Sequence, residues 1–354
     1  MNANYEPHAF SRRSFLKGAG AVGAAGLLAA CGSSSSTSGS TSGAASGSTA
    51  TTGGLTEVYS YESNVREIES WNVLYSQNAS DFNVLTNCVD GLLSADCYGK
   101  PVAAIAESWE HNEDASVWTF HLREDVDWCD VNGEVKGHIT SKDFLVGSEW
   151  VLNQFKNSAF NTSMPLQTIA GAEEYYEYTV EQGDAAADLT YQDMLDHGVG
   201  IEAPDDYTLV FTCKNPCPYF DTVAGYVCFY PASEELINEL GIEGFRAATY
   251  AEMWYCGPYL IEEFVQTNTK SFIPNPNWYG ANDHSRFERV VVTMLTDMVT
   301  GYQLYQNREL DEIELTESTV TQIQNDSSNE FNNQLCERRL DLFPNLLRAA
   351  VQLP

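Results

Sequence analysis

The cysteines are the side chains of this sequence best suited to redox or metal chemistry. Eight of them follow Cys31, at positions 88, 97, 129, 213, 217, 228, 256 and 336. In an exported chain, an even number of cysteines permits disulfides, although the pairing does not follow from the spacing. A metal or iron–sulfur site is the alternative, but the chain contains no Cys-x-x-Cys pair. Because Cys213-x-x-x-Cys217 also lacks a nearby pair of histidines, we favour structural or disulfide-bonded cysteines and expect neither a metal site nor another cofactor.

Histidines and paired carboxylates form no catalytic constellation. The six histidines are scattered along the chain, which disfavours nickel. Adjacent acidic pairs such as Glu173-Glu174 and Glu262-Glu263 point apart on a helix or strand, so a solvated surface explains them better than an acid/base dyad. The sequence lacks Gly-x-Ser-x-Gly, His-Glu-x-x-His, a P-loop and a dinucleotide-binding glycine motif at a strand–helix turn. We therefore predict that the protein is not an enzyme.

The charge balance limits the partners. The chain has 18 lysines and arginines against 50 aspartates and glutamates, which gives a formal net charge of -32. Nucleic acid and anionic lipid headgroups would be repelled by this charge. Cationic ligands stay open, but a solvated acidic surface is the commoner reason for such a composition. Hydrophobic residues make up 43% of the chain, so the part from Leu55 onward can form a packed core and is long enough for two domains.

Residues 1–30 are typical of a twin-arginine lipoprotein signal peptide. The segment Ser11–Lys17 contains the arginine pair, and a small-residue apolar run from Ala19 to Ala30 follows it. That run is too short and too rich in glycine and alanine for a permanent membrane span. It ends in Leu-Ala-Ala-Cys, which resembles a lipobox, so Cys31 is the predicted lipidation site. Residues 31–54 are almost entirely Ser, Thr, Gly and Ala and would form a flexible linker at the extracytoplasmic face of a bacterial membrane.

The elements that would position a binding site begin with residues 102–155. Alternating apolar residues predict a half-buried strand at Val117–Leu122. Thr140 with Asp143 three residues later is typical of a capping box at the start of a helix. The helix would place four side chains on one face: Phe144, Ser148, Val151 and Phe155.

Five further elements follow from the same periodicities. Strands are expected at Leu55–Tyr61, Tyr207–Cys213 and Glu288–Leu295, and helices at Asp81–Leu93 and Thr296–Leu310. The polar and aromatic segment before the first of these helices is typical of a long surface loop.

Five short motifs within residues 102–155 occur in the order and spacing of a known family. They are Ala106–Trp109, Trp118–Arg123, Val126–Trp128, Asp130–Gly133 and Thr140–Phe144. Together they resemble the peptide/nickel class of extracellular solute-binding proteins, which are the oligopeptide- and dipeptide-binding receptors of ABC importers. Similar motifs recur later, at Asn215–Phe220, Cys256–Tyr259 and Asn275–Tyr279. The chain departs from the family in a surface turn, where Val131 and Asn132 separate an aspartate and a glycine that are usually adjacent.

The resemblance implies a mixed α/β fold of the type II periplasmic-binding-protein kind. Residues 55–89 and 232–340 would form the main lobe, and residues 90–231 an inserted subdomain. Family members continue considerably further, so we expect a partial receptor whose second ligand lobe is largely missing. Residues 341–354 do not resemble the family and would be an aberrant end, produced by truncation or a reading-frame slip.

The resemblance also implies a function, the capture of short peptides for an ABC permease and ATPase complex by a monomeric receptor. Two segments would contact the peptide: Gln77, Asn78 and Ala79 before the first helix, and Phe160 or Asn161 in a second, less closely aligned segment. The acidic residue that pairs with the ligand's amine in this family lies in the absent lobe, so we expect weak or no binding. The alternatives are another solute such as a nickel chelate or a sugar, a twin-arginine-exported metal or redox protein, and a non-functional truncated receptor.

Overall fold

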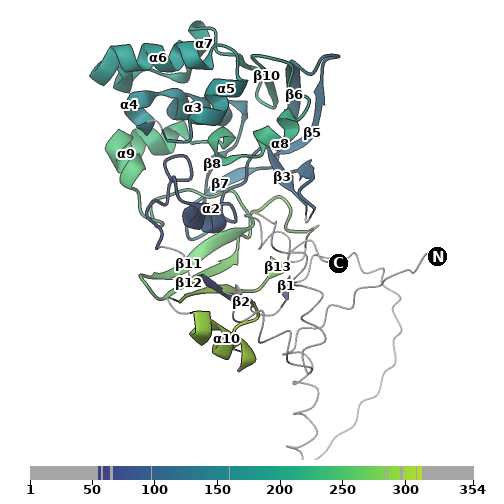
Figure 1. Cartoon of the computed structure of the whole chain (residues 1–354), viewed down its shortest axis with the longest axis vertical. Coiled ribbons are helices and arrows are strands. Elements are labelled where there is room, and N and C mark those ends of the chain that lie inside the picture. The colour runs from purple at the N-terminus through teal and green to yellow at the C-terminus, as the bar shows by residue number, and fades with distance from the viewer. Residues whose placement is uncertain are drawn as a thin grey trace, which may run out of the picture. The chain divides into compact units, whose positions relative to one another are not determined.

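The computed structural model of the chain describes its central part (Figure 1). The described residues are 55–56, 59–63, 67–96, 98–158, 160–282, 284, 286–295, 298–307 and 309–312. All of them belong to one unit of the chain, which runs from Thr52 to Gln352. The predicted signal peptide, Cys31, the linker and residues 341–354 lie outside the described residues, as do Cys97 and Cys336.

One four-stranded antiparallel sheet has the order β5-β6-β10-β9. Its strands are β5 (Ala106–His111), β6 (Val117–Leu122), β9 (Ile201–Asp205) and β10 (Thr208–Thr212). The strand predicted at Val117–Leu122 is confirmed with the same bounds, and its side chains alternate between buried and half-buried. Because successive strand residues point to opposite faces, β6 sends its three largest apolar side chains into the core.

Helices cover this sheet, and most of them lie together beside it in Figure 1. They are α3 (Ser141–Leu152), α4 (Gln154–Asn157), α5 (Ser163–Thr168), α6 (Ala172–Gln182), α7 (Tyr191–Asp196) and α8 (Phe220–Ala224), with short 3-10 turns at Gly183–Asp188 and Val227–Phe229. The predicted capping box is confirmed, because the Asp143 carboxylate accepts the Thr140 N–H at 2.9 Å. Helix α3 ends at Leu152, earlier than predicted.

The early end of α3 follows from Asn153. Its backbone is extended, and its side-chain oxygen accepts the N–H groups of Phe155 and Lys156, which starts the separate helix α4. The prediction that Phe155 continues the face of Phe144, Ser148 and Val151 on one helix is therefore wrong. An asparagine that caps a new helix competes with continuation of the old one.

A second four-stranded sheet has the order β11-β12-β14-β2. Its strands are β2 (Tyr59–Ser63), β11 (Tyr259–Val265), β12 (Thr269–Pro274) and β14 (Val290–Met294). Strand β2 pairs in parallel with β14, and the short strand β1 (Leu55–Thr56) pairs in parallel with β13 (Arg286–Phe287). The single strand predicted at Leu55–Tyr61 is thus divided between two partners.

The remaining described elements lie outside these two sheets. They are α2 (Ala79–Leu85), α9 (Glu234–Ala247), α10 (Met298–Gln306), and the two-stranded pairs β3 (Leu93–Ala95) with β4 (Pro101–Ala103) and β7 (Asp127–Cys129) with β8 (Val135–His138). Of the described helices, none combines the length and the apolar character that a bilayer crossing demands.

Helix α2 is shorter than the prediction of Asp81–Leu93. The hydroxyl of Thr86 donates to the Phe82 carbonyl at 2.6 Å, and the carbonyl of Cys88 accepts the N–H groups of Cys256 and Gly257. A backbone carbonyl that accepts from a distant segment is no longer available to the N–H four residues later, so the helix cannot continue through Cys88 to Leu93. Tertiary pairing with a segment about 170 residues away therefore overrides the helical pattern of the sequence.

The strands of the first sheet all come from residues 106–212, and those of the second sheet from residues 59–63 and 259–294. Apolar side chains from both sets of strands contribute to one buried cluster, which includes Phe120, Phe211 and Phe272. Residues 90–231 stay the proposed limits of an inserted subdomain.

Candidate functional site

The loop that precedes α2 is organised around one buried carboxylate. Asp81 accepts the hydroxyl of Ser76 at 2.6 Å and the backbone N–H groups of Glu69 and Ser70 at 3.2 and 3.1 Å. Burial raises the pKa of Asp81, although these hydrogen bonds oppose the rise. The three bonds draw residues 69–76 around the first turn of α2 and fix the course of the chain just before the predicted ligand residues.

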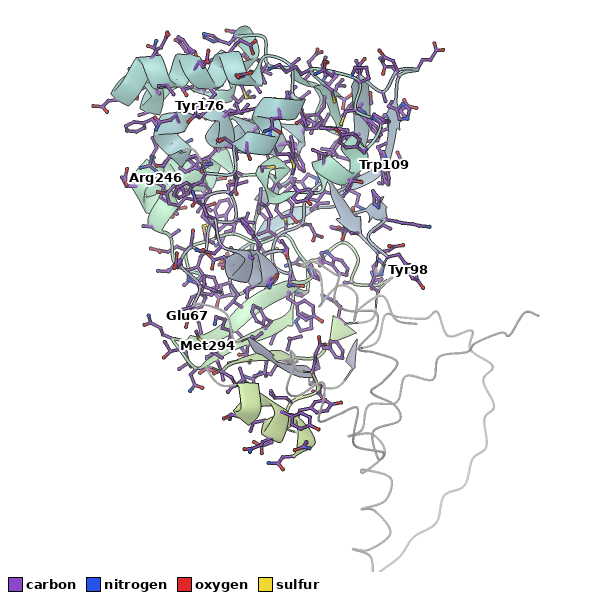
Figure 2. All side chains as sticks on the ribbon, in the orientation of Figure 1. Glu67, Tyr98, Trp109, Tyr176, Arg246 and Met294 are labelled. Atoms are coloured by element: carbon purple, nitrogen blue, oxygen red, sulfur yellow. The ribbon has the colours of Figure 1, made fainter. Side chains whose placement is uncertain are left out.

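The start of this loop is tied to the second sheet by Glu67. Its carboxylate lies 2.7 Å from the buried ammonium of Lys270 in β12 and also accepts the backbone N–H of Thr267 at 2.5 Å. Burial raises the pKa of Glu67, but the bonds from Lys270, Thr267 and Ile68 lower it more, so it lies below its usual 4.5. The loop is therefore anchored at both ends by carboxylates (Figure 2 labels Glu67).

The first predicted segment forms the outer rim of the loop. Gln77 and Ala79 are exposed and Asn78 is half-buried. The side-chain amide of Asn78 donates to Glu69 Oε2 at 2.8 Å, and its backbone N–H donates to the Ser76 hydroxyl at 3.1 Å. The side chain of Gln77 therefore lies open to solvent, while that of Asn78 is held beside a carboxylate.

The second predicted segment lies against residues 74–76, which come directly before the first. Asn161 donates from Nδ2 to the carbonyl oxygens of Leu74 at 3.1 Å and Ser76 at 2.7 Å. The ring of Phe160 lies 4.7 Å from that of Tyr75, centroid to centroid. The structure thus brings Asn161 to the loop just before Gln77, more than 80 residues away in the chain.

Asn161 occupies an unusual backbone position. Its φ is +57°, in the left-handed region, where asparagine is tolerated far better than most residues other than glycine. Ser158 at the C-terminus of α4 has φ +52° as well. The chain therefore turns sharply at two residues after α4, Ser158 and Asn161. The turn at Asn161 places its side-chain amide against the carbonyls of Leu74 and Ser76.

Arg246 of α9 contacts both α4 and Tyr75 of the loop and is labelled in Figure 2. Its Nε donates to the Lys156 carbonyl at 2.7 Å, and a terminal nitrogen donates to the carbonyl of Phe155. The guanidinium also lies 5.7 Å from the ring centroids of Tyr75 and Phe155, within range of a cation–π contact. We call the rim residues 77–79, Tyr75, Phe160, Asn161 and Arg246 the junction site.

Sequence reasoning missed Tyr75 and Arg246. Tyr75 stands two positions before Gln77, so its closeness in sequence to the predicted ligand residues could have indicated that it belongs to the site. Arg246 has no local signal, because its partners lie 90 and 91 residues away in the chain and only the folded structure brings them together.

A buried polar network supports α4 beneath the junction site. The ammonium of Lys156 lies 2.8 Å from Glu149 Oε2, while Asn153 and Tyr175 donate to Glu149 Oε1 at 2.8 and 3.1 Å. Burial raises the pKa of Glu149 despite the neighbouring ammonium. Lys156 also donates to the carbonyl of Leu189, so the ion pair fixes α4 from two sides.

The polar groups of the junction site are suited to hydrogen bonding with a ligand at the surface. A cavity of about 20 Å³ lies behind the loop, between Asn72, Leu74, Trp128 and Trp254, and is large enough for one water molecule only. In the part of the chain that the structure describes, no three His, Cys, Asp or Glu side chains converge as metal ligands would. The six described cysteines, at 88, 129, 213, 217, 228 and 256, are buried and free, so disulfides among them are not formed.

Comparisons with known proteins agree with this architecture. Residues 100–338 match the family described as bacterial extracellular solute-binding proteins, family 5 Middle, and residues 9–29 match the twin-arginine translocation signal. The oligopeptide-binding protein SarA of Streptococcus gordonii is 28% identical over 260 residues, which are 73% of this chain and 35% of SarA. The periplasmic oligopeptide-binding protein OppA of Escherichia coli is 26% identical over 249 residues, 70% of this chain and 41% of OppA. The chain therefore spans less than half the length of these relatives.

Solved structures are similar too. An oligopeptide ABC transporter substrate-binding domain from Bacillus anthracis superposes with a TM-score of 0.64 at 22% identity, over 78% of this chain and 48% of that one. Listeria monocytogenes OppA bound to peptide gives a TM-score of 0.62 at 22% identity, over 77% and 49%. These likenesses show the fold, a mixed α/β fold of the type II periplasmic-binding-protein kind. The twin-arginine signal and the family place the chain outside the cytoplasm. Because the family match covers well over half of the sequence, the chain belongs to the bacterial extracellular solute-binding proteins, family 5.

Proposed function

We propose that this chain is the substrate-binding component of an ABC importer and captures short peptides at the junction site. The observation that carries the proposal is that Asn161, in one predicted ligand segment, is hydrogen-bonded to the loop directly before the other segment, in a chain of this family. The named relatives SarA and OppA are oligopeptide-binding proteins, which supports peptide over a nickel chelate or a sugar. In this proposal the protein is a monomer, has no cofactor and catalyses no reaction.

Capture would depend on polar groups along the rim. An extended peptide presents N–H and C=O groups at regular spacing, and main-chain hydrogen bonds to an exposed edge give affinity without side-chain specificity. Gln77 offers a free side-chain amide, and Glu69, bonded to Asn78, adds a carboxylate that attracts a cationic group. Clamshell receptors close on a ligand by hinge motion, and the junction site would supply one of the two faces.

The test is a thermal-shift titration of the full chain with mixed di- to pentapeptides. We expect a rise in Tm that saturates with peptide concentration, because a ligand that binds the folded state alone stabilises it. Gln77→Ala should reduce the shift, while Gln192→Ala on the exposed surface of α7 should not change it. Parallel titrations with nickel–histidine chelate and with a panel of sugars distinguish the alternative ligands. If no peptide shifts the Tm, the proposal fails for this chain.

We also propose that a lipid on Cys31 anchors the protein at the extracytoplasmic face of the membrane. The Leu-Ala-Ala-Cys sequence and the linker after it support this anchor. Cells that express the chain and are fed a radiolabelled fatty acid should incorporate the label. The Cys31→Ser variant should lose the label and leave the membrane fraction, and retention of both would contradict the anchor.

A further inference from the structure

Two cysteines that the junction site does not use lie beside one another. Cys213 directly follows β10, and its backbone N–H donates to the Ser116 carbonyl at 2.7 Å. The backbone N–H of Cys217 donates to the carbonyl of the preceding residue, Ala115, at 2.9 Å. Since both cysteines are hydrogen-bonded to consecutive residues just before β6, the three-residue turn between them brings their backbones to the same place.

These two thiols are also the least deeply buried of the described cysteines. Cys213 is 6% and Cys217 is 5% exposed, whereas the other four described cysteines are between 0% and 4% exposed. The three residues between the pair are exposed, and so are Pro218 and Tyr219 after it. Both cysteines belong to the buried cluster, so a reagent would reach their sulfur atoms through a movement of this exposed turn.

The thiols interact with each other. Burial raises the pKa of Cys213 to about 12, and the neighbouring Cys217 contributes to the rise. A thiol with a raised pKa yields little thiolate, and thiol–disulfide exchange proceeds through the thiolate, so oxidation of this pair by a disulfide should be slow. Pro216 and Pro218 flank Cys217 and restrict its backbone, which favours a turn that keeps the two sulfur atoms close.

We propose that Cys213 and Cys217 are a disulfide-forming site, oxidised after export by a disulfide-bearing oxidant. The thiolate of one cysteine attacks the oxidant's S–S bond, which forms a mixed disulfide and releases one thiol. The second cysteine then attacks the mixed disulfide, closes the Cys213–Cys217 bond and releases the other thiol. The two cysteines lose two protons and two electrons, and the oxidant is reduced to two thiols. Disulfides persist outside the cytoplasm, where the export signal sends this chain.

Trypsin provides a direct test, because Lys214 lies between the two cysteines. The full chain is purified reduced, incubated under native conditions with oxidised glutathione, and then alkylated, denatured and digested. Cleavage at Lys156, Lys214 and Arg246 separates residues 157–214, with Cys213 as the one cysteine, from residues 215–246. We expect mass spectrometry to find these two peptides joined, with the loss of two hydrogen atoms, and separate again after reduction.

The second peptide also contains Cys228, so variants assign the bond. The link should persist in Cys228→Ser and disappear in Cys217→Ser, with circular dichroism to show that each variant is folded. Three results would overturn the inference. In the first, the two peptides stay separate after native oxidation but are joined by oxidation in denaturant. In the second, the link survives Cys217→Ser. In the third, residues 157–214 are linked to any other cysteine.

Discussion

At Asn161 we expect a glycine substitution to be less destabilising than an alanine substitution, which is the reverse of the usual order in helices and strands. Its side chain makes two hydrogen bonds to the loop of the junction site, and its backbone has φ +57°. Replacement by glycine removes the two bonds but leaves the backbone relaxed. Replacement by alanine removes the same bonds and also places a Cβ in the left-handed region.

The expected magnitudes follow from these two contributions. Each hydrogen bond contributes about 0.5–1.5 kcal/mol net, so Asn161→Gly should lower the free energy of unfolding by about 1–3 kcal/mol. The left-handed backbone adds about 1–2 kcal/mol for a residue with a Cβ, so Asn161→Ala should be less stable than Asn161→Gly by about that amount. In ordinary backbone, alanine is instead the more stable of the two by about 0.5–1 kcal/mol.

Urea unfolding of the full chain, followed by tryptophan fluorescence, measures these differences. Gly137→Ala in β8 is the matched control, because Gly137 has no left-handed φ and an added Cβ would meet nothing within 4 Å. This control should be as stable as the original chain or more stable. The reasoning is refuted if Asn161→Ala equals or exceeds Asn161→Gly in stability. If Asn161→Gly matches the original chain, the two hydrogen bonds contribute nothing.

Three further predictions concern the elements that support the site. Gly147→Ala should destabilise the chain by about 1–3 kcal/mol in urea unfolding, since its Cβ would lie 2.3 Å from the carbonyl oxygen of Tyr230 in the packed core; an increase in stability would contradict this close approach. Lys156→Met should cost about 3–5 kcal/mol by the same assay, because it leaves the carboxylate of Glu149 buried without its cation; a loss below about 1 kcal/mol would show that the pair is solvated. The ion pair of Glu67 stabilises the fold above pH 4.5 and is lost as the pH falls through the lowered folded-state pKa, so the difference in stability between the original chain and Glu67→Gln should shrink in acid; a constant difference from about pH 7 to about pH 3 would contradict the sign.

The sequence predicts best the elements that are specified locally. The strand at Val117–Leu122 has clean alternation, and its bounds are confirmed. The capping box at Thr140 is also confirmed, because both of its reciprocal bonds lie within four residues. The strand expected at Glu288–Leu295 and the helix expected at Thr296–Leu310 are confirmed as the shorter β14 and α10, whose ends depend on neighbours that periodicity does not show.

The wrong predictions of helix bounds arise where another hydrogen-bonding partner competes with continuation of the helix. That partner is either a segment distant in sequence or a local capping side chain. The helix of α2 does not continue to Leu93, because the carbonyl of Cys88 is taken by residues 256 and 257. Phe155 leaves the face of α3 because Asn153 starts a new helix. Arg246 could not be placed at the site, since nothing in its surroundings along the chain indicates its contacts with Tyr75 and Phe155.

The junction site separates residues that hold its shape from residues that can face a ligand. The Nδ2 atom of Asn161 carries two hydrogens, and the carbonyls of Leu74 and Ser76 use both, so a peptide could reach only its oxygen or its backbone. One face of Phe160 is likewise occupied by Tyr75. Gln77 carries no such constraint. Substitutions at Asn161 should therefore lower stability and binding together, whereas Gln77→Ala should lower binding alone, and an equal loss of stability in both variants would contradict this division.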